Sequence, residues 1–160
     1  MDFTHLDKKG RAQMVDVSEK KVGLRHARAR GAIYLQESTL AAIAQDKLAK
    51  GDVFSAARLA GIMAAKRCDE LIPLCHNIPL EHVSIELRPD SNPARVEIES
   101  EVICRAKTGA EMEALLAVTI AALTVYDMVK AVDRAAKIGE IRLIEKSGGK
   151  SGRFVREENA

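Results

Sequence analysis

Two neighbouring stretches of the chain alternate between hydrophobic and polar residues with a period of two. The first, residues 82–89, carries Val83, Ile85 and Leu87 on one side, and the second covers residues 95–105. A pattern of this kind is typical of half-buried β-strands. The sequence between them, Pro-Asp-Ser-Asn-Pro, is rich in turn-forming residues. The pattern therefore predicts a β-hairpin.

A long hydrophobic segment, residues 109–133, is predicted to form a helix because it runs to Asp133 without a further Gly or Pro. Its start reads Thr108-Gly-Ala-Glu111, which has the spacing of a capping box. In a capping box the acidic side chain bonds backbone N–H groups, so this assignment gives Glu111 a structural role.

Weaker patterns predict the remaining elements. They are a strand over residues 27–36, a helix from an N-cap at Ser38 to about Asp46, a helix from an N-cap at Asp52 to Leu71 before Pro73, and a strand over residues 138–145.

The resulting order, β-α-α-β-β-α-β, predicts an α+β fold of the ferredoxin-like kind, with an antiparallel or mixed sheet and helices packed on one face. A chain of 160 residues fits a single domain, 1–160. Residues 1–26 are dense in charge and are predicted to be a mobile arm.

The composition of the chain argues against nucleic acid and membranes as partners. A net charge of +2 and 3% aromatic residues provide neither a strong positive field nor a stacking surface for nucleic acid. The chain shows no signal-peptide pattern and no stretch expected to span a membrane. Its three cysteines, an odd number, are expected to be reduced thiols in the cytoplasm.

Two familiar motifs fail on spacing. The Ser147–Gly152 segment resembles the end of a phosphate-binding P-loop, but Ile144 stands where the first glycine is required. The segment can still offer backbone N–H groups and lysines to an anion. Cys68 and Cys75 are seven residues apart, beyond the usual spacing of paired zinc ligands, so no structural zinc site is predicted. Spacing leaves open a catalytic metal held by residues that are distant in the sequence.

Polar residues inside apolar segments are the candidates for chemistry. His76 interrupts an apolar, proline-bounded stretch and can transfer protons near neutral pH, although a hydrogen-bonded core histidine explains it equally well. Asp127 and Lys130 lie one helical turn apart within an apolar run. Such pairs are mostly surface salt bridges, but desolvation here would make them an acid/base couple.

Helix length separates these candidates. Glu113 and Asp127 share a side of the helix, yet 14 residues place them about 21 Å apart. If both helix ends serve one site, neighbouring subunits of an oligomer must contribute opposite ends.

Several stretches resemble the cyclic pyranopterin monophosphate synthase (MoaC) family, in the same order along nearly the whole chain. They are MVDVS (14–18), KGDVF (50–54), LIPLCH (71–76), KTG (107–109), EMEAL (111–115), AALTVYDM (121–128) with KAV (130–132), and KSGGKSG (146–152).

The resemblance implies a ferredoxin-like fold and hexamers built as trimers of dimers, with sites at subunit interfaces. It implies conversion of 3′,8-cyclo-7,8-dihydro-GTP to cyclic pyranopterin monophosphate and pyrophosphate by a lyase of molybdenum-cofactor biosynthesis. No cofactor is firmly implied, and Mg²⁺ accompanying the triphosphate is left open. By position, the matching catalytic residues are Asp127, Lys130, Lys50 and His76, and the substrate-binding residues are Leu74, Cys75, His76, Met112, Glu113, Arg25 and Lys146.

An alternative from another class is a ferredoxin-like nucleotide- or RNA-binding module without catalysis. The low net charge and scarce aromatic residues disfavour its RNA-binding form.

Overall fold

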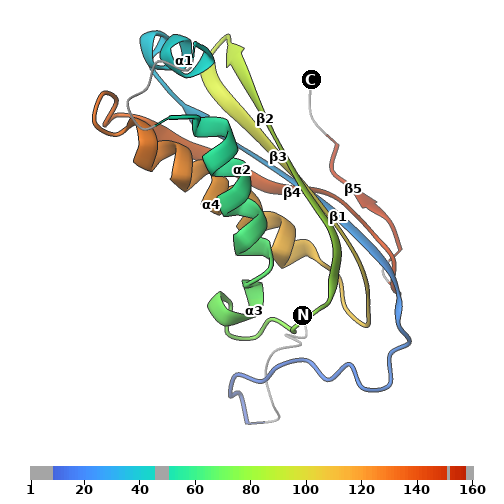
Figure 1. Cartoon of the computed structure of the whole chain (residues 1–160). Coiled ribbons are helices and arrows are strands. Elements are labelled where there is room, and N and C mark those ends of the chain that lie inside the picture. Colours follow the sequence, from blue (N-terminus) through green and yellow to red (C-terminus); the bar gives the residue numbers. More distant parts are fainter. Residues whose placement is uncertain (1–8, 46–50, 151, 158–160) are drawn as a thin grey trace.

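The computed structural model describes residues 9–45, 51–150 and 152–157. Within them one antiparallel sheet has the strand order β2-β3-β1-β4-β5 (Figure 1). The strands are β1 (Gly23–Tyr34), β2 (Leu80–Ser91), β3 (Ala94–Ala106), β4 (Lys137–Ser147) and β5 (Phe154–Val155).

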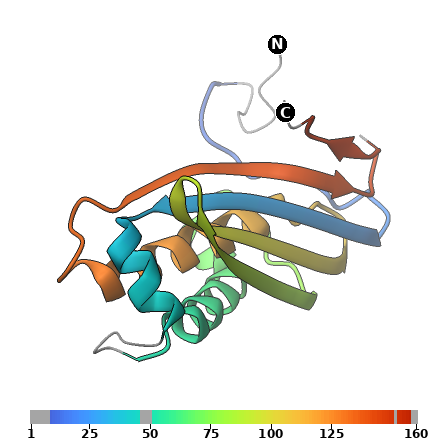
Figure 2. The same ribbon diagram turned by 90° about the horizontal axis from the view of Figure 1, so that it is seen from above.

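The helices of the described part lie on one face of this sheet, as the view from above shows (Figure 2). The predicted α+β class is therefore confirmed, with the sheet antiparallel rather than mixed. The helices are α1 (Glu37–Ala44), α2 (Val53–Ala65), α3 (Cys68–Leu71) and α4 (Glu111–Val129).

The predicted hairpin is confirmed as β2 and β3. The two strands pair up to Ser91 and Ala94, so β2 continues two residues and β3 one residue further into the expected turn than the alternation indicated. The central strand β1 then pairs with β3 on one side and β4 on the other.

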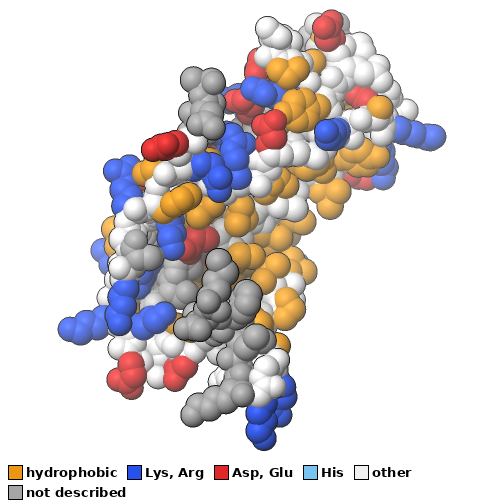
Figure 3. Space-filling model, turned by 180° about the vertical axis from the view of Figure 1, so that it is seen from behind, with side chains coloured by type: hydrophobic (Ala, Val, Ile, Leu, Met, Phe, Trp, Pro, Cys, Tyr) orange, Lys and Arg blue, Asp and Glu red, His pale blue; other side chains and the backbone are white. Residues whose placement is uncertain are grey.

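The sheet face away from the helices is polar. Arg28 and Arg30 of β1 donate hydrogen bonds to Glu99 of β3, and His26 bonds Glu101 at 2.7 Å. Figure 3 shows, from behind, Lys and Arg side chains most numerous on the left, with others at the upper right and the lower end, and hydrophobic side chains in a band through the centre and right. The two faces of β1 thus differ in chemistry, as a two-layer fold requires.

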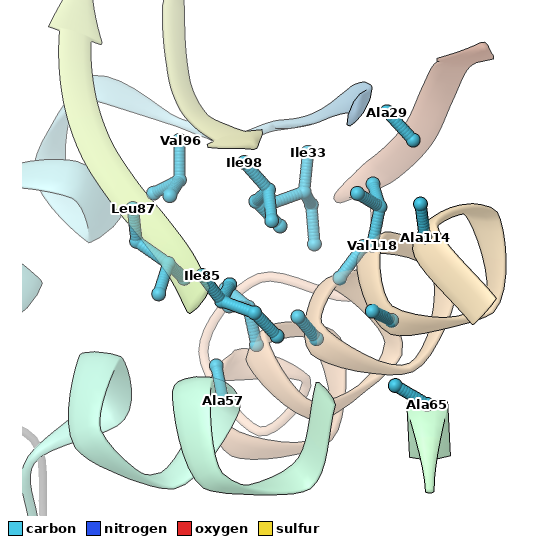
Figure 4. Close-up of a cluster of buried hydrophobic side chains, with 14 of the residues drawn as sticks. Ala29, Ile33, Ala57, Ala65, Ile85, Leu87, Val96, Ile98, Ala114 and Val118 are labelled. Carbon is cyan, nitrogen blue, oxygen red and sulfur yellow. The ribbon is translucent and has the colours of Figure 1, made fainter. Parts of the chain in front are cut away.

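The core lies between the sheet and α4. Ile33, Ile98 and Val118 are fully buried and point toward one another (Figure 4). Alanines at helical spacing, among them Ala114, bring α4 close to the strands. By length and hydropathy alone α4 could also cross a membrane, but here its buried residues make it the core helix of the sheet.

Close contact between α2 and α4 depends on Gly61. A Cβ added there would lie 2.7 Å from the carbonyl oxygen of Ala117 and would collide with the Ile85 side chain. We expect Gly61→Ala to lower the free energy of unfolding by about 1–3 kcal/mol, since backbone cannot move aside as a flexible side chain can. Urea denaturation would measure this. Gly23→Ala, where an added Cβ meets nothing within 4 Å, is the control and should change little.

Of the two predicted helix N-caps, one is wrong and one is confirmed. Helix α1 begins after Gln36 rather than Ser38, because the buried carboxylate of Asp133 accepts from the Gln36 backbone N–H at 2.8 Å and fixes the chain there. The predicted end at Asp46 lies outside the described residues. Asp52 does cap α2, accepting from the Ser55 N–H at 3.0 Å.

Two further helix predictions are wrong in extent. Helix α2 ends at Ala65, and residues to Leu71 form the separate short helix α3. Helix α4 begins at Glu111 and ends at Val129, and among the described residues no side chain caps its N-terminus. The capping box therefore does not form, because the Glu111 carboxylate bonds Lys146 instead.

The predicted arm is also too long. Residues 23–26 belong to β1, so the arm cannot extend to residue 26. Part of the segment before β1 is held by hydrogen bonds from His76 to the Val15 carbonyl and from Lys107 to the Ser18 carbonyl.

Candidate functional site

A cleft of about 1010 Å³ opens at one end of the sheet. The antiparallel register places the start of β1 beside the ends of β3 and β4, since Gly23 pairs with Ala106 and His26 with Ser147. The N-terminus of α4 reaches the same end. The cleft is lined by Asp16, Ser18, Glu19, Lys20, Lys21, Arg25, His26, Lys107, Thr108, Gly109, Glu111, Lys146, Ser147, Gly148, Gly149 and Lys150.

Positive charge dominates this lining. It contains six lysines and arginines against three carboxylates, and the two glycines of the 147–150 loop add exposed backbone. Cations grouped with Gly-rich backbone favour a ligand with several negative charges, such as a phosphate chain. The Gly-rich segment thus lines a cationic cleft, although it is not a P-loop.

Arg25 is the most fixed of these cations. It is only 7% exposed, and its Nε donates to the Ala106 carbonyl at 3.0 Å. The loop containing Gly148 and Gly149 packs against it: both glycines have positive φ, and a Cβ on Gly149 would collide with the Arg25 guanidinium. The predicted binding residue Arg25 therefore belongs to the cleft through β1, not through a mobile arm.

The packing of Gly149 on Arg25 gives a testable expectation. In Gly149→Ala the new methyl group would displace the guanidinium, so the dissociation constant for inorganic triphosphate should rise about tenfold, the loss of one charged hydrogen bond. Isothermal titration calorimetry measures this. Gly152→Ala is the matched control, because Gly152 also has positive φ but its added Cβ would meet nothing within 4 Å. Equal losses in both variants would mean that backbone strain, and not Arg25, is responsible.

Lys146 lies across the cleft and forms an ion pair with Glu111 at 2.9 Å. The predicted capping box gave Glu111 a structural role only, so Glu111 was not among the predicted site residues. The Glu111 carboxylate lies inside the cationic cleft and keeps the Lys146 side chain in place. Glu111 is therefore a candidate site residue that the sequence did not predict. Asp16, His26 and Lys107 were also missed, and nothing in the periodicity distinguished them from other charged residues.

His76 holds the segment that forms one wall of the cleft. Its Nε2–H donates to the Val15 carbonyl at 2.8 Å, while Lys107 Nζ donates to the Ser18 carbonyl at 2.7 Å. Asp16 closes a turn between these contacts by accepting from the Ser18 N–H, which lowers the pKa of its carboxyl. In this structure the His76 side chain therefore holds the backbone of the segment before β1, and it is not a histidine bonded within the core.

Beside the cleft, Cys68, Cys75 and Glu113 form a compact cluster. The Cys75 thiol donates to Glu113 Oε1 at 3.5 Å, and the two sulfurs are 3.8 Å apart. Glu113 is 2% exposed, and burial raises the pKa of its carboxyl. Burial and the nearby Glu113 raise the pKa of the Cys75 thiol, and burial also raises that of Cys68.

The other two predicted binding residues lie around this cluster. Leu74 precedes Cys75 in a tight turn, closed by a hydrogen bond from the Cys75 N–H to the Ile72 carbonyl. Met112 precedes Glu113 in the first turn of α4 and is 39% exposed. The structure thus brings the predicted binding residues together at one end of α4.

Asp127 and Lys130 lie at the other end of α4. They form the expected ion pair, and the hydrogen bond that Lys130 Nζ donates to the Asp127 carboxylate raises the pKa of Lys130. However, their side chains are 58% and 52% exposed in the single chain, so the expected desolvation is absent there. The apolar run misled the prediction because its hydrophobic residues cover only part of the helix surface. Lys50 lies outside the described residues.

Comparison with known proteins gives a consistent result. The model of the MoaC family matches residues 14–149. Proteins named cyclic pyranopterin monophosphate synthase are similar over almost the full length. The chain is 56% identical to one from Chloroflexus aurantiacus over 155 residues, covering 97% of this chain and 95% of the relative. It is 53% identical to one from Roseiflexus castenholzii over 156 residues, covering 98% and 99%. It is 57% identical to cyclic pyranopterin monophosphate synthase 3 of Mycobacterium tuberculosis over 156 residues, covering 98% and 88%.

Proposed function

Because this chain belongs to the MoaC family, we propose that it is a cyclic pyranopterin monophosphate synthase of molybdenum-cofactor biosynthesis. It converts 3′,8-cyclo-7,8-dihydro-GTP to cyclic pyranopterin monophosphate and releases pyrophosphate, which makes it a lyase. The observation that carries this proposal is the cationic cleft at the N-terminal end of α4, next to the Cys75–Glu113 contact.

The cleft suits the phosphate part of the reaction. Closing a cyclic phosphate while expelling pyrophosphate develops negative charge on phosphate oxygens, and fixed cations stabilise it. Arg25 is held by the Ala106 carbonyl and Lys146 by Glu111, so both are oriented before substrate arrives. The base portion of the substrate would then extend toward Cys75, Glu113 and Met112, whose polar and apolar groups fit a flat heterocycle.

The rearrangement of the ring system needs repeated proton transfers, and Asp127 with Lys130 supplies a carboxylate and an amine in contact. Glu111 and Asp127 are 16 residues apart on one helix, about 24 Å. One substrate therefore reaches both groups only if a second subunit brings its Asp127 end to the cleft. Docking would also desolvate the pair, which is the condition for a useful shift of pKa.

The surface supports association of copies. Large hydrophobic side chains are exposed on α2 and α4, among them Leu59, Met63, Met112 and Leu123. Hydrophobic surface of this kind marks interaction sites. We propose a homohexamer arranged as a trimer of dimers and acting in the cytoplasm, and light scattering would test the size.

The reaction itself gives the decisive test. Purified protein incubated with 3′,8-cyclo-7,8-dihydro-GTP should release pyrophosphate and form cyclic pyranopterin monophosphate. Recovery of bound but unchanged nucleotide would contradict the proposal and favour the non-catalytic nucleotide-binding module.

A further inference from the structure

The cluster of Cys68, Cys75 and Glu113 has the dimensions of a coordination site. One ligand atom from each residue lies within 4.8 Å of the other two. The cysteine spacing of seven residues had argued against a metal, but α3 and the turn after it fold back and place the two sulfurs 3.8 Å apart.

These separations match those of a tetrahedral zinc ion. With Zn–S bonds of about 2.3 Å, two sulfurs on a tetrahedron are about 3.8 Å apart. A sulfur and a carboxylate oxygen bonded at about 2.1 Å are about 3.6 Å apart in the same geometry. The observed values are 3.8 Å between the sulfurs and 3.5 Å between Cys75 Sγ and Glu113 Oε1.

The second carboxylate oxygen points independently to a ligand. Glu113 is 2% exposed, and its Oε2 is buried without a hydrogen-bond partner in the described part of the chain. A buried polar atom of this kind is costly unless something binds it. A cation within the cluster would bind the carboxylate. It would also compensate the negative charge of the two thiols and the carboxyl group, which are deprotonated when they bind a metal.

We propose that Cys68, Cys75 and Glu113 bind a thiophilic divalent cation, Zn²⁺ being the best fit. Two thiolates and one carboxylate favour zinc over magnesium or calcium, which prefer oxygen ligands alone. Three protein ligands leave a fourth coordination position for water or for a nitrogen or oxygen atom of a small molecule. His76 is not part of this set: its Nε2–H donates to the Val15 carbonyl, and among the described residues only Cys68, Cys75 and Glu113 have ligand atoms this close together.

Cobalt and zinc titrations of the full-length reduced protein, kept in a non-thiol reductant, test the proposal. We expect one Co²⁺ per chain, with a thiolate-to-cobalt charge-transfer band and the strong visible bands of tetrahedral Co²⁺, and displacement of Co²⁺ by Zn²⁺. In Cys68→Ser and Glu113→Gln the dissociation constant for Zn²⁺ should rise at least about 100-fold. Binding is measured without substrate, so the result is separate from the fate of the proposed reaction.

Cys104→Ser is the matched control. Cys104 is a fully buried cysteine outside the cluster, so this variant should bind Co²⁺ and Zn²⁺ as the unchanged protein does. Zn²⁺ should also raise the Tm of the unchanged protein and of Cys104→Ser, but not that of Cys68→Ser. The proposal is overturned by an octahedral Co²⁺ spectrum, by equal losses in Cys104→Ser, or by full binding in Cys75→Ser.

Discussion

Asp127→Asn is expected to reduce the rate of cyclic pyranopterin monophosphate formation by about 10²–10⁴-fold, the usual contribution of one acid/base group. The amide keeps the size of the side chain but can neither take up a proton nor hold the charge that raises the pKa of Lys130. Because the carboxylate is 58% exposed in the single chain, the fold does not depend on it, and the Tm should stay the same.

Glu86→Gln is the matched control for this loss. Glu86 is also exposed and ion-paired, in its case with Arg88 on β2, and it lies outside the cleft. We expect no change in rate for Glu86→Gln. An Asp127→Asn protein that keeps more than about a tenth of the activity would exclude a proton-transfer role for Asp127.

The sequence predicted the architecture well where a pattern repeats over many residues. The alternation in β2 and β3 and the unbroken apolar run of α4 were sufficient to identify these elements. Boundaries failed where a distant side chain decides them. Asp133 fixes the start of α1 from 97 positions away, and Lys146 draws Glu111 away from the helix cap.

The candidate site also has one part that the sequence predicted and one part that it could not predict. Arg25 and Lys146 could be proposed because the surrounding stretches resemble a family, and the structure places both in one cleft. The cysteine cluster could not be predicted, because the separation of two sulfurs in space depends on how α3 turns back, not on their spacing in the sequence. The exposure of Asp127 could not be predicted either, since an apolar run does not reveal which side of a helix is covered.

Mixed oligomers of Arg25→Ala and Asp127→Asn are expected to regain activity that neither variant has alone. Arg25 lines the cleft with Glu111, and Asp127 is about 24 Å along the same helix, so a site that uses both takes them from two subunits. After co-expression at equal levels, about a quarter of the sites receive an intact Arg25 from one subunit and an intact Asp127 from the other. Activity should therefore recover to about a quarter of the unchanged protein, measured as pyrophosphate release.

The control mixes Asp127→Asn with Lys130→Ala. These residues form one ion pair at one end of α4, so every site in that mixture takes a damaged pair and activity should stay low. Recovery in the first mixture without recovery in the second requires that the anion-binding cleft and the acid/base pair come from different chains. A first mixture no more active than the mean of its two components would contradict a site shared between two subunits.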